Sequence, residues 1–72
     1  MVEVELGMED SNGPYVELVV FVKLKKGLST GGQAKVLVKS GVVVVNGNVE
    51  MRAKKKLRKG DLVSISGEGW MV

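Results

Sequence analysis

The chain has 72 residues, which suffice for one small domain but leave no room for a separate catalytic domain. It contains no cysteine and no histidine, which excludes disulfide cross-links, thiolate zinc sites and the usual near-neutral acid–base group. The formal net charge is only +3, so any attraction to a polyanion depends on how the charges are distributed.

The composition of the first residues predicts no targeting signal. Residues 1–6 (MVEVEL) lack a basic segment and a long apolar run, so no signal peptide is expected. No apolar stretch approaches the roughly 20 residues that a membrane helix needs. We therefore expect one soluble, monomeric domain over residues 1–72, located in the cytoplasm and without a membrane partner.

Alternation and composition predict the first two segments. Apolar and acidic residues alternate over residues 2–6, which indicates a half-buried strand with an acidic outer face. Residues 7–14 (GMEDSNGP) are rich in glycine and turn-forming residues, which predicts a loop. Because its acids would repel a polyanion, we expect this loop to lie away from a surface that binds one.

The secondary structure of residues 15–26 is ambiguous. Four valines give the segment strong β propensity. However, Leu18, Phe21 and Val22 form an i, i+3, i+4 helical face. Pro14 suits the first turn of a helix, and the lysines near the end of the segment suit a helix C-terminus. Composition alone therefore favours helix and strand about equally.

The string TGGQAKVLVKSGVVVVNG, which begins at Thr30, predicts a helix, its end, a strand and a turn in direct succession. Thr30 and Gln33 have the spacing of a capping box at a helix start. Gly41 ends the helix, and the valine run that follows is typical of a strand. Asn46-Gly47 then predicts a two-residue hairpin turn, because both turn positions need positive φ.

The remaining segments complete the predicted fold. Residues 48–51 form the returning strand, residues 52–59 (RAKKKLRK) a basic segment, residues 60–61 a turn and residues 62–65 another strand. Residues 70–72 form a short apolar tail. The expected product is an α+β fold, with a helix–turn–helix unit packed on a small, mostly antiparallel β-sheet whose first and last strands pair.

The charges are strongly segregated along the chain. Residues 1–20 contain five acids and no basic residue. Residues 21–61 contain all 11 basic residues and only two acids, for a net charge of +9. A field of this size attracts a polyanion to one side of a protein. The alternative interpretation is that the lysines only form a solvated surface. The segregation of charge over forty residues weakens that interpretation.

Two groups near the second helix could bind an anion. The backbone N–H groups of Thr30, Gly31 and Gly32 would lie at the positive end of the helix dipole, although an ordinary helix cap explains the same residues. Lys35 and Lys39 lie on the solvent face, opposite the apolar face that contains Ala34, Leu37 and Val38. Neither lysine has an acid four residues away, although a solvated helix face also explains them.

The third group is the basic segment: Arg52, Lys54, Lys55, Lys56, Arg58 and Lys59. Six positive charges within eight residues repel one another, and a phosphate backbone would relieve that repulsion. The alternative is a solubilising sheet edge. Because side chains alternate along an extended segment, we expect Arg52 and two or three of the lysines to face one partner.

Two classes of function are disfavoured. Three aromatic residues are too few for a platform that stacks unpaired bases, which favours folded or double-helical RNA recognised by shape and phosphate position. No Ser–His, Cys–His or paired-carboxylate arrangement can be assembled. We therefore expect no enzymatic activity, no catalytic residue, no metal site and no cofactor.

The ordered motifs TGGQAK, V-x-V-N-G, E-x-R and K-x-L-x-x-G-D-x-V resemble the S4-type RNA-binding domain, or alpha-L motif, over about residues 16–66. The most similar subgroup is that of the small stand-alone bacterial members of YbcJ type. The resemblance implies a helix over residues 15–26. It also implies these core positions: Leu18, Phe21, Ala34, Leu37, Val45, Leu57 and Val63.

In that family, the second helix, the turn before it and the loop after the hairpin form the RNA-binding surface. Members usually carry Ser-Arg where this chain has Thr30-Gly31, so that arginine contact is missing, although the stand-alone members also have glycine there. The residues and the resemblance together indicate an RNA-binding set of Ser29, Thr30, Gly31, Gly32, Gln33, Lys35, Lys39, Asn46, Arg52, Lys54, Lys55, Lys56 and Arg58.

The function expected from the sequence is that of a small non-enzymatic protein that binds structured RNA, either ribosomal or transfer RNA, through a basic face. The alternative is a protein-interaction adaptor that docks the same basic face on an acidic protein partner.

Overall fold

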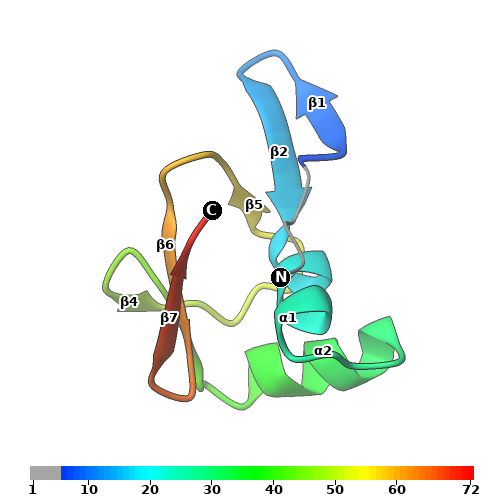
Figure 1. Cartoon of the computed structure of the whole chain (residues 1–72), viewed down its shortest axis with the longest axis vertical. Helices are drawn as coiled ribbons and strands as arrows, with labels where there is room; N and C mark the ends of the chain where they lie inside the picture. Colours follow the sequence, from blue (N-terminus) through cyan, green and yellow to red (C-terminus); the bar gives the residue numbers. More distant parts are fainter. Residues whose placement is uncertain (1–5) are drawn as a thin grey trace.

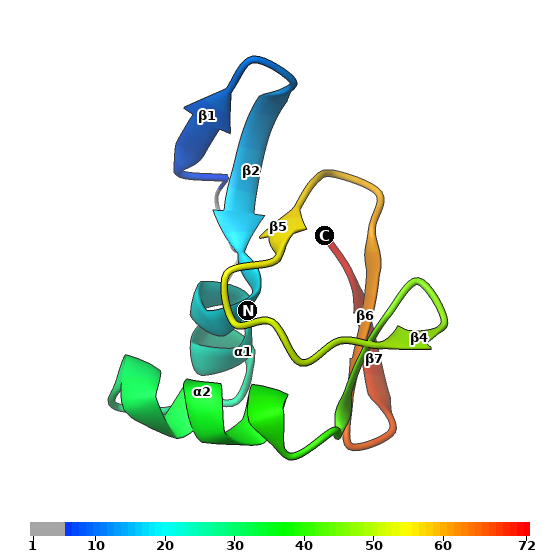
Figure 2. The same ribbon diagram turned by 180° about the vertical axis from the view of Figure 1, so that it is seen from behind.

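Two helices and seven short strands make up residues 6–72, the part of the chain that a computed structural model describes. The elements are β1 (Met8–Asp10), β2 (Gly13–Glu17), α1 (Leu18–Lys25), α2 (Gly31–Lys39), β3 (Val43–Val45), β4 (Asn48–Val49), β5 (Lys56–Leu57), β6 (Leu62–Ile65) and β7 (Glu68–Met71). The strands form two antiparallel sheets, β1-β2-β5 and β4-β3-β6-β7, with α2 crossing beneath α1 (Figures 1 and 2).

The expected α+β class, with a two-helix unit packed on antiparallel strands, is confirmed. Two sheets replace the single sheet that the sequence predicted. The strand expected over residues 2–6, and its pairing with the last strand, lie outside the described residues except for Leu6.

The N-terminal hairpin occupies the segment where a loop was predicted. Residues 8–10 form β1, and only Ser11 and Asn12 remain as the turn into β2. The side chain of Asp10 accepts a hydrogen bond from the Asn12 N–H at 2.9 Å, and Gly13 adopts φ +110°. Turn-forming residues therefore specify a tight turn here, and the flanking residues pair across it.

The ambiguous segment over residues 15–26 divides into a strand and a helix. The predicted helix is wrong for residues 15–17, because Val16 and Glu17 pair with β5. The helix begins only at Leu18, with Glu17 as its N-cap, and ends at Lys25. The β propensity of Val16 prevails because a partner strand is present, whereas the other three valines of the segment lie in α1. The partner strand, β5, lies in the basic segment, where none was expected.

The start of α2 follows the predicted capping motif with one difference. The Thr30 side chain accepts a hydrogen bond from the Gln33 N–H at 3.3 Å. The Gln33 side chain accepts from the N–H and the hydroxyl of Ser29, at 3.1 and 3.2 Å, instead of from the N–H of Thr30. At the other end, Gly41 follows the helix with φ +84°, as predicted.

Two tight hairpins build the four-stranded sheet. Asn46 and Gly47 have φ +51° and +86°, as the prediction of a two-residue turn between β3 and β4 requires. The returning strand ends at residue 49, two residues earlier than predicted. Ser66 and Gly67 make a second turn of this kind, with φ +51° and +88°. The predicted apolar tail is therefore wrong for Trp70 and Met71, which belong to β7 and pair with β6, while the Val72 N–H donates to the Asp61 carbonyl at 2.8 Å.

The core is formed where both helices face the sheets. Six of the seven core positions implied by the resemblance are buried, and the seventh, Leu37, is half-buried and packs against them. Phe21 of α1 meets Trp70 of β7 edge-on, with ring centroids 6.5 Å apart. The buried residues of the cluster are Val16, Leu18, Phe21, Val22, Ala34, Val38, Val43, Val45, Leu57, Val63 and Ile65.

Alanine substitution at two glycines tests the turn. A Cβ at Gly47 would meet no atom within 4 Å, so only its positive φ opposes a side chain. We expect Gly47→Ala to lower the free energy of unfolding by about 1–2 kcal/mol. Gly31 has equally open space without positive φ, so Gly31→Ala should leave stability unchanged or raise it by up to about 1 kcal/mol. Urea denaturation measures both, and equal effects would contradict the placement of the turn.

Candidate nucleic-acid interface

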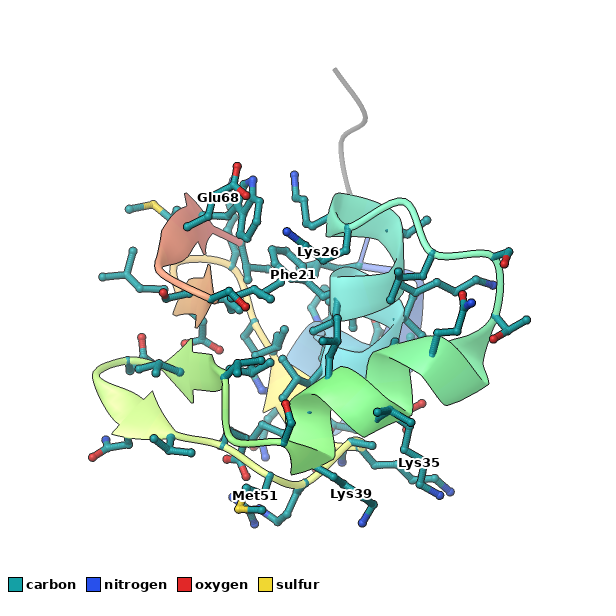
Figure 3. The ribbon with its side chains drawn as sticks, turned by 90° about the horizontal axis from the view of Figure 1, so that it is seen from below. Phe21, Lys26, Lys35, Lys39, Met51 and Glu68 are labelled. Atoms are coloured by element: carbon teal, nitrogen blue, oxygen red, sulfur yellow. The ribbon has the colours of Figure 1, made fainter. Side chains whose placement is uncertain are left out.

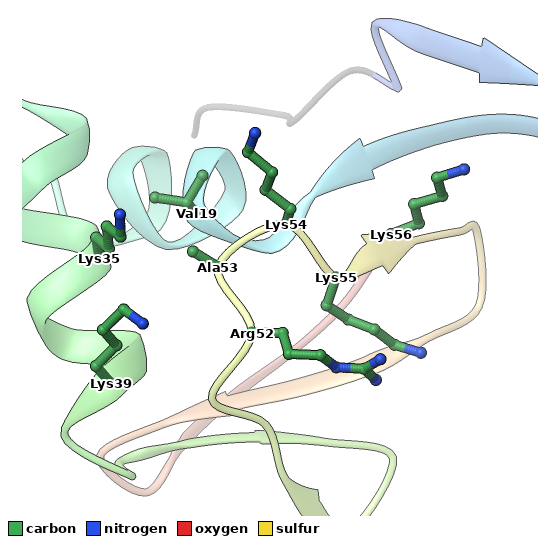
Figure 4. A pocket seen from close by; sticks show the side chains of 8 residues that line it. All are labelled: Val19, Lys35, Lys39, Arg52, Ala53, Lys54, Lys55 and Lys56. Carbon is green, nitrogen blue, oxygen red and sulfur yellow. The ribbon is translucent and has the colours of Figure 1, made fainter.

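An open groove with a volume of about 710 Å³ lies between the exposed face of α2 and the loop that precedes β5 (Figure 4). Lys35 and Lys39 of α2 stand across this groove from the loop, which carries a cation at three of its four lining positions, and Lys56 at the start of β5 adds another. No described carboxylate lines the groove. The lining residues are Val19, Lys35, Lys39, Arg52, Ala53, Lys54, Lys55 and Lys56.

Backbone hydrogen bonds hold the basic loop against the start of α1. The first N–H groups of a helix have no partner within the helix, and Glu17, the N-cap of α1, provides no side-chain cap. Instead, the N–H of Leu18 donates to the carbonyl of Lys55 at 2.8 Å, and the N–H of Val19 donates to that of Ala53 at 2.9 Å. The loop is thereby fixed beside the groove by its backbone, and this attachment does not depend on its side chains.

Three lysines of the groove are available to an external anion. Lys35 and Lys39 are exposed and lie one helical turn apart, and Lys54 is exposed on the loop. None of the three makes an ion pair or side-chain hydrogen bond with any residue from 6 to 72. Their positive charges therefore remain uncompensated within the described part of the chain.

Asp10 compensates two other cations of the basic segment. Its carboxylate accepts hydrogen bonds from Lys56 Nζ at 2.7 Å and from Arg58 Nη2 at 2.9 Å. Arg58 Nη1 also donates to the Gly13 carbonyl at 2.9 Å, and both cations lie over the ring of Tyr15. Asp10 thus brings the acidic hairpin into contact with the basic segment, because the hairpin folds onto β5, although no residue from 7 to 14 lines the groove.

These contacts shift the ionisation of the acid in a definite direction. The hydrogen bonds from Arg58 and then from Lys56 hold the pKa of Asp10 well below its usual range. In turn, the hydrogen bond to Asp10 raises the pKa of Lys56. Asp10 is thus ionised at neutral pH, and the hairpin is joined to β5 by a charged network.

The other predicted residues lie outside the groove lining. Ser29, Thr30 and Gln33 use their side chains in the cap of α2, although the N–H groups of Gly31 and Gly32 have no acceptor among residues 6–72. Asn46 bonds to the start of β6, and Arg58 holds the hairpin. The structure therefore brings together Lys35, Lys39, Arg52, Lys54, Lys55 and Lys56, and it does not add Ser29, Thr30, Gly31, Gly32, Gln33, Asn46 or Arg58 to the lining.

Apolar residues that the predicted set did not include accompany the basic groove. Val19 and Ala53 line it. Met51, which directly precedes Arg52 in the chain, is 52% exposed. Val36 is 68% exposed on α2, the helix that carries Lys35 and Lys39. The surface in and around the groove therefore presents both cationic and apolar groups.

A second hollow, of about 480 Å³, lies on the outer face of the four-stranded sheet. Val44, Leu62 and Met71 contribute apolar side chains, and no charged residue from 6 to 72 lines it. It therefore does not suit a polyanion. Within residues 6–72, no group of acids could hold a metal ion, and no helix is long and apolar enough to cross a membrane.

Two comparisons with known proteins agree with each other. The family model of the S4 domain matches residues 10–72 of this chain. The "Putative RNA-binding protein YbcJ" of Escherichia coli (strain K12) is 39% identical over 59 residues, which cover 82% of this chain and 84% of that protein. The "Uncharacterized protein YbcJ" of Shigella flexneri shows the same identity and coverage.

Hydrogen exchange tests the attachment of the loop to α1. Because Leu18 and Val19 donate to loop carbonyls, we expect their amide protons to exchange far more slowly than those of Gly31 and Gly32. NMR-detected exchange in D₂O at neutral pH measures all four amides. If the first amides of α1 exchanged as fast as those of α2, the loop would not be held as described.

The ion-pair network predicts a pH-dependent stability. The pKa of Asp10 is depressed in the folded state, so its stabilising contribution is full above the unfolded-state pKa of about 3.9 and is lost as the pH falls below it. We expect Asp10→Asn to lower the Tm at pH 7, and the difference from the wild type to shrink below about pH 4. Glu9→Gln, on the exposed side of the same strand, is the control and should change little at either pH. A pH-independent loss in Asp10→Asn would contradict the charged network.

Proposed function

This chain belongs to the S4 domain family, and on that premise we propose that it is a small, non-enzymatic RNA-binding protein that holds structured RNA in its basic groove. The observation that carries the proposal is the set of uncompensated lysines, Lys35, Lys39 and Lys54, arranged on both walls of one groove. A phosphate backbone is the polyanion that such an arrangement suits.

The distribution of aromatic residues favours RNA with a defined shape over an unpaired strand. Tyr15 and Phe21 are buried, and Trp70 is half-buried with its ring edge-on to that of Phe21. No aromatic side chain lines the groove among the described residues. Unpaired bases would find no stacking platform there, whereas the phosphates of a folded or duplex RNA could meet lysines from two elements.

Individual roles follow from the contacts that each side chain already makes. Lys35, Lys39, Lys54 and Lys55 contact phosphates directly, and the free N–H groups at the start of α2 can donate hydrogen bonds to one further phosphate. Lys56 serves both RNA and the hairpin, since Asp10 shares its charge. Ribosomal and transfer RNA are the structured RNAs we favour, with the protein acting as a monomer in the cytoplasm.

The salt dependence of RNA binding tests this proposal. With about four phosphate contacts, the slope of log affinity against log salt concentration should be on the order of −3 to −4. Lys35→Ala and Lys39→Ala should each weaken binding across RNA sequences alike and flatten the slope by about one unit. Fluorescence anisotropy with a labelled RNA hairpin and a single strand of the same composition, at several salt concentrations, gives both quantities.

Lys26→Ala is the matched control for these variants. Lys26 lies beside Glu68, on the opposite side of the molecule from Lys35 and Lys39 in Figure 3, and its removal changes the net charge equally. Its effect on the slope should be much smaller. Equal effects of all three variants, or no hairpin binding at low salt, would refute the groove as an RNA site. A basic face that docks on an acidic protein would produce the latter result.

A further inference from the structure

Glu50 is an acid at the edge of the basic groove, and its carboxylate is committed to Arg52. The Arg52 backbone N–H and Nε both donate to Glu50 Oε2, at 3.1 and 3.0 Å, and Arg52 Nη2 donates to Oε1 at 3.1 Å. The Glu50 N–H in turn donates to the Val43 carbonyl at 2.9 Å, which anchors the acid to β3.

This contact leaves the outer end of the guanidinium free. Glu50 uses the Nε side of the group, and within residues 6–72 Nη1 has no acceptor. The Glu50 side chain is only 14% exposed, whereas that of Arg52 is 74% exposed and extends away from the loop beside Lys55 (Figure 4). The remaining Nη1 and Nη2 donors form a planar fork, the arrangement that binds a phosphate with two hydrogen bonds.

A fixed guanidinium binds differently from a mobile one. A free arginine side chain must lose rotamer freedom when it orders on a ligand, and prior ordering removes that part of the cost. Glu50 directly follows β4, and its carboxylate accepts from both the backbone and the side chain of Arg52. It therefore acts on the orientation of Arg52 more directly than on the overall fold.

We propose that Glu50 is a positioning residue of the RNA interface, which holds the guanidinium of Arg52 with its outer edge ready to bind one phosphate group of the RNA backbone. The proposal rests on the proposed function. It gives a role to a negatively charged side chain that, by electrostatics alone, would weaken the attraction of the groove for RNA.

Charge and positioning predict opposite signs for one substitution. The contact with Arg52 lowers the pKa of Glu50 to about 2, so the carboxylate is ionised at neutral pH. Glu50→Gln therefore adds one unit of positive charge near the groove, which by electrostatics alone should strengthen RNA binding. The glutamine amide has only one accepting oxygen, so it cannot reproduce the two parallel hydrogen bonds that Nε and Nη2 make to separate carboxylate oxygens. If Glu50 positions Arg52, binding should weaken despite the added charge.

The experiment measures the affinity of the labelled RNA hairpin by anisotropy at one fixed salt concentration. We expect Glu50→Gln to raise the Kd about three- to tenfold. Glu9→Gln, which adds the same charge on the exposed part of β1, should leave the Kd unchanged or lower it. Arg52→Lys keeps the charge but lacks the fork, and we expect it to raise the Kd to a similar extent.

A double-variant cycle separates positioning from a structural role. If Glu50 acts through the guanidinium, Glu50→Gln should add no further loss of affinity in the Arg52→Lys background. A further loss in that background would mean that Glu50 only shapes the loop, and it would overturn the inference. The thermal unfolding of each variant, recorded in parallel, identifies loss of folded protein. If Glu50→Gln does not fold, Arg52→Lys decides the question, because an unchanged Kd would overturn the role of the fork.

Failure of this inference differs from failure of the proposed function. Unchanged or tighter binding by Glu50→Gln, while Lys35→Ala and Lys39→Ala still weaken binding, would overturn the role of Glu50 and leave the RNA groove intact. Absence of hairpin binding by the wild-type protein at low salt would refute both.

Discussion

The loop that precedes β5 supplies the missing cap of α1, and the architecture of the basic face depends on this contact. The carbonyls of Ala53 and Lys55 accept the hydrogen bonds of the first two N–H groups of the helix. One interaction thus satisfies donors that would otherwise be unpaired in a largely buried position and places the basic loop opposite α2. The side chains of the loop remain free to face solvent because its backbone carries the attachment.

The same loop connects the two sheets. After its contact with α1 the chain continues into β5, which pairs with β2, while β4, just before the loop, belongs to the other sheet. Leu57 of β5 is fully buried and anchors this crossing in the core. This wall of the groove is fixed at both ends and along its backbone. It is suited to a rigid ligand, because the loop loses little conformational entropy on binding.

The cations of this protein fall into two groups that the net charge does not distinguish. Lys56, Arg58 and Arg52 have carboxylate partners, which orient them and join the N-terminal hairpin or the loop to the rest of the fold. Lys35 and Lys39 have no such partner among residues 6–72. The paired cations fix the shape of the surface, and the unpaired ones provide its positive electrostatic potential. A count of basic residues therefore overstates the positive charge available to a ligand.

The sequence by itself determined the features that depend on neighbouring residues. The cap of α2 at Thr30, its end at Gly41 and the turn at Asn46-Gly47 are where the motifs predicted them, because each is decided by the backbone preference of one or two residues. Only the tertiary structure decided where α1 begins, that the basic segment contains a strand, and which cations are neutralised. These features depend on partners up to 48 residues apart, such as Asp10 and Arg58, and local propensity carries no information about contacts at that separation.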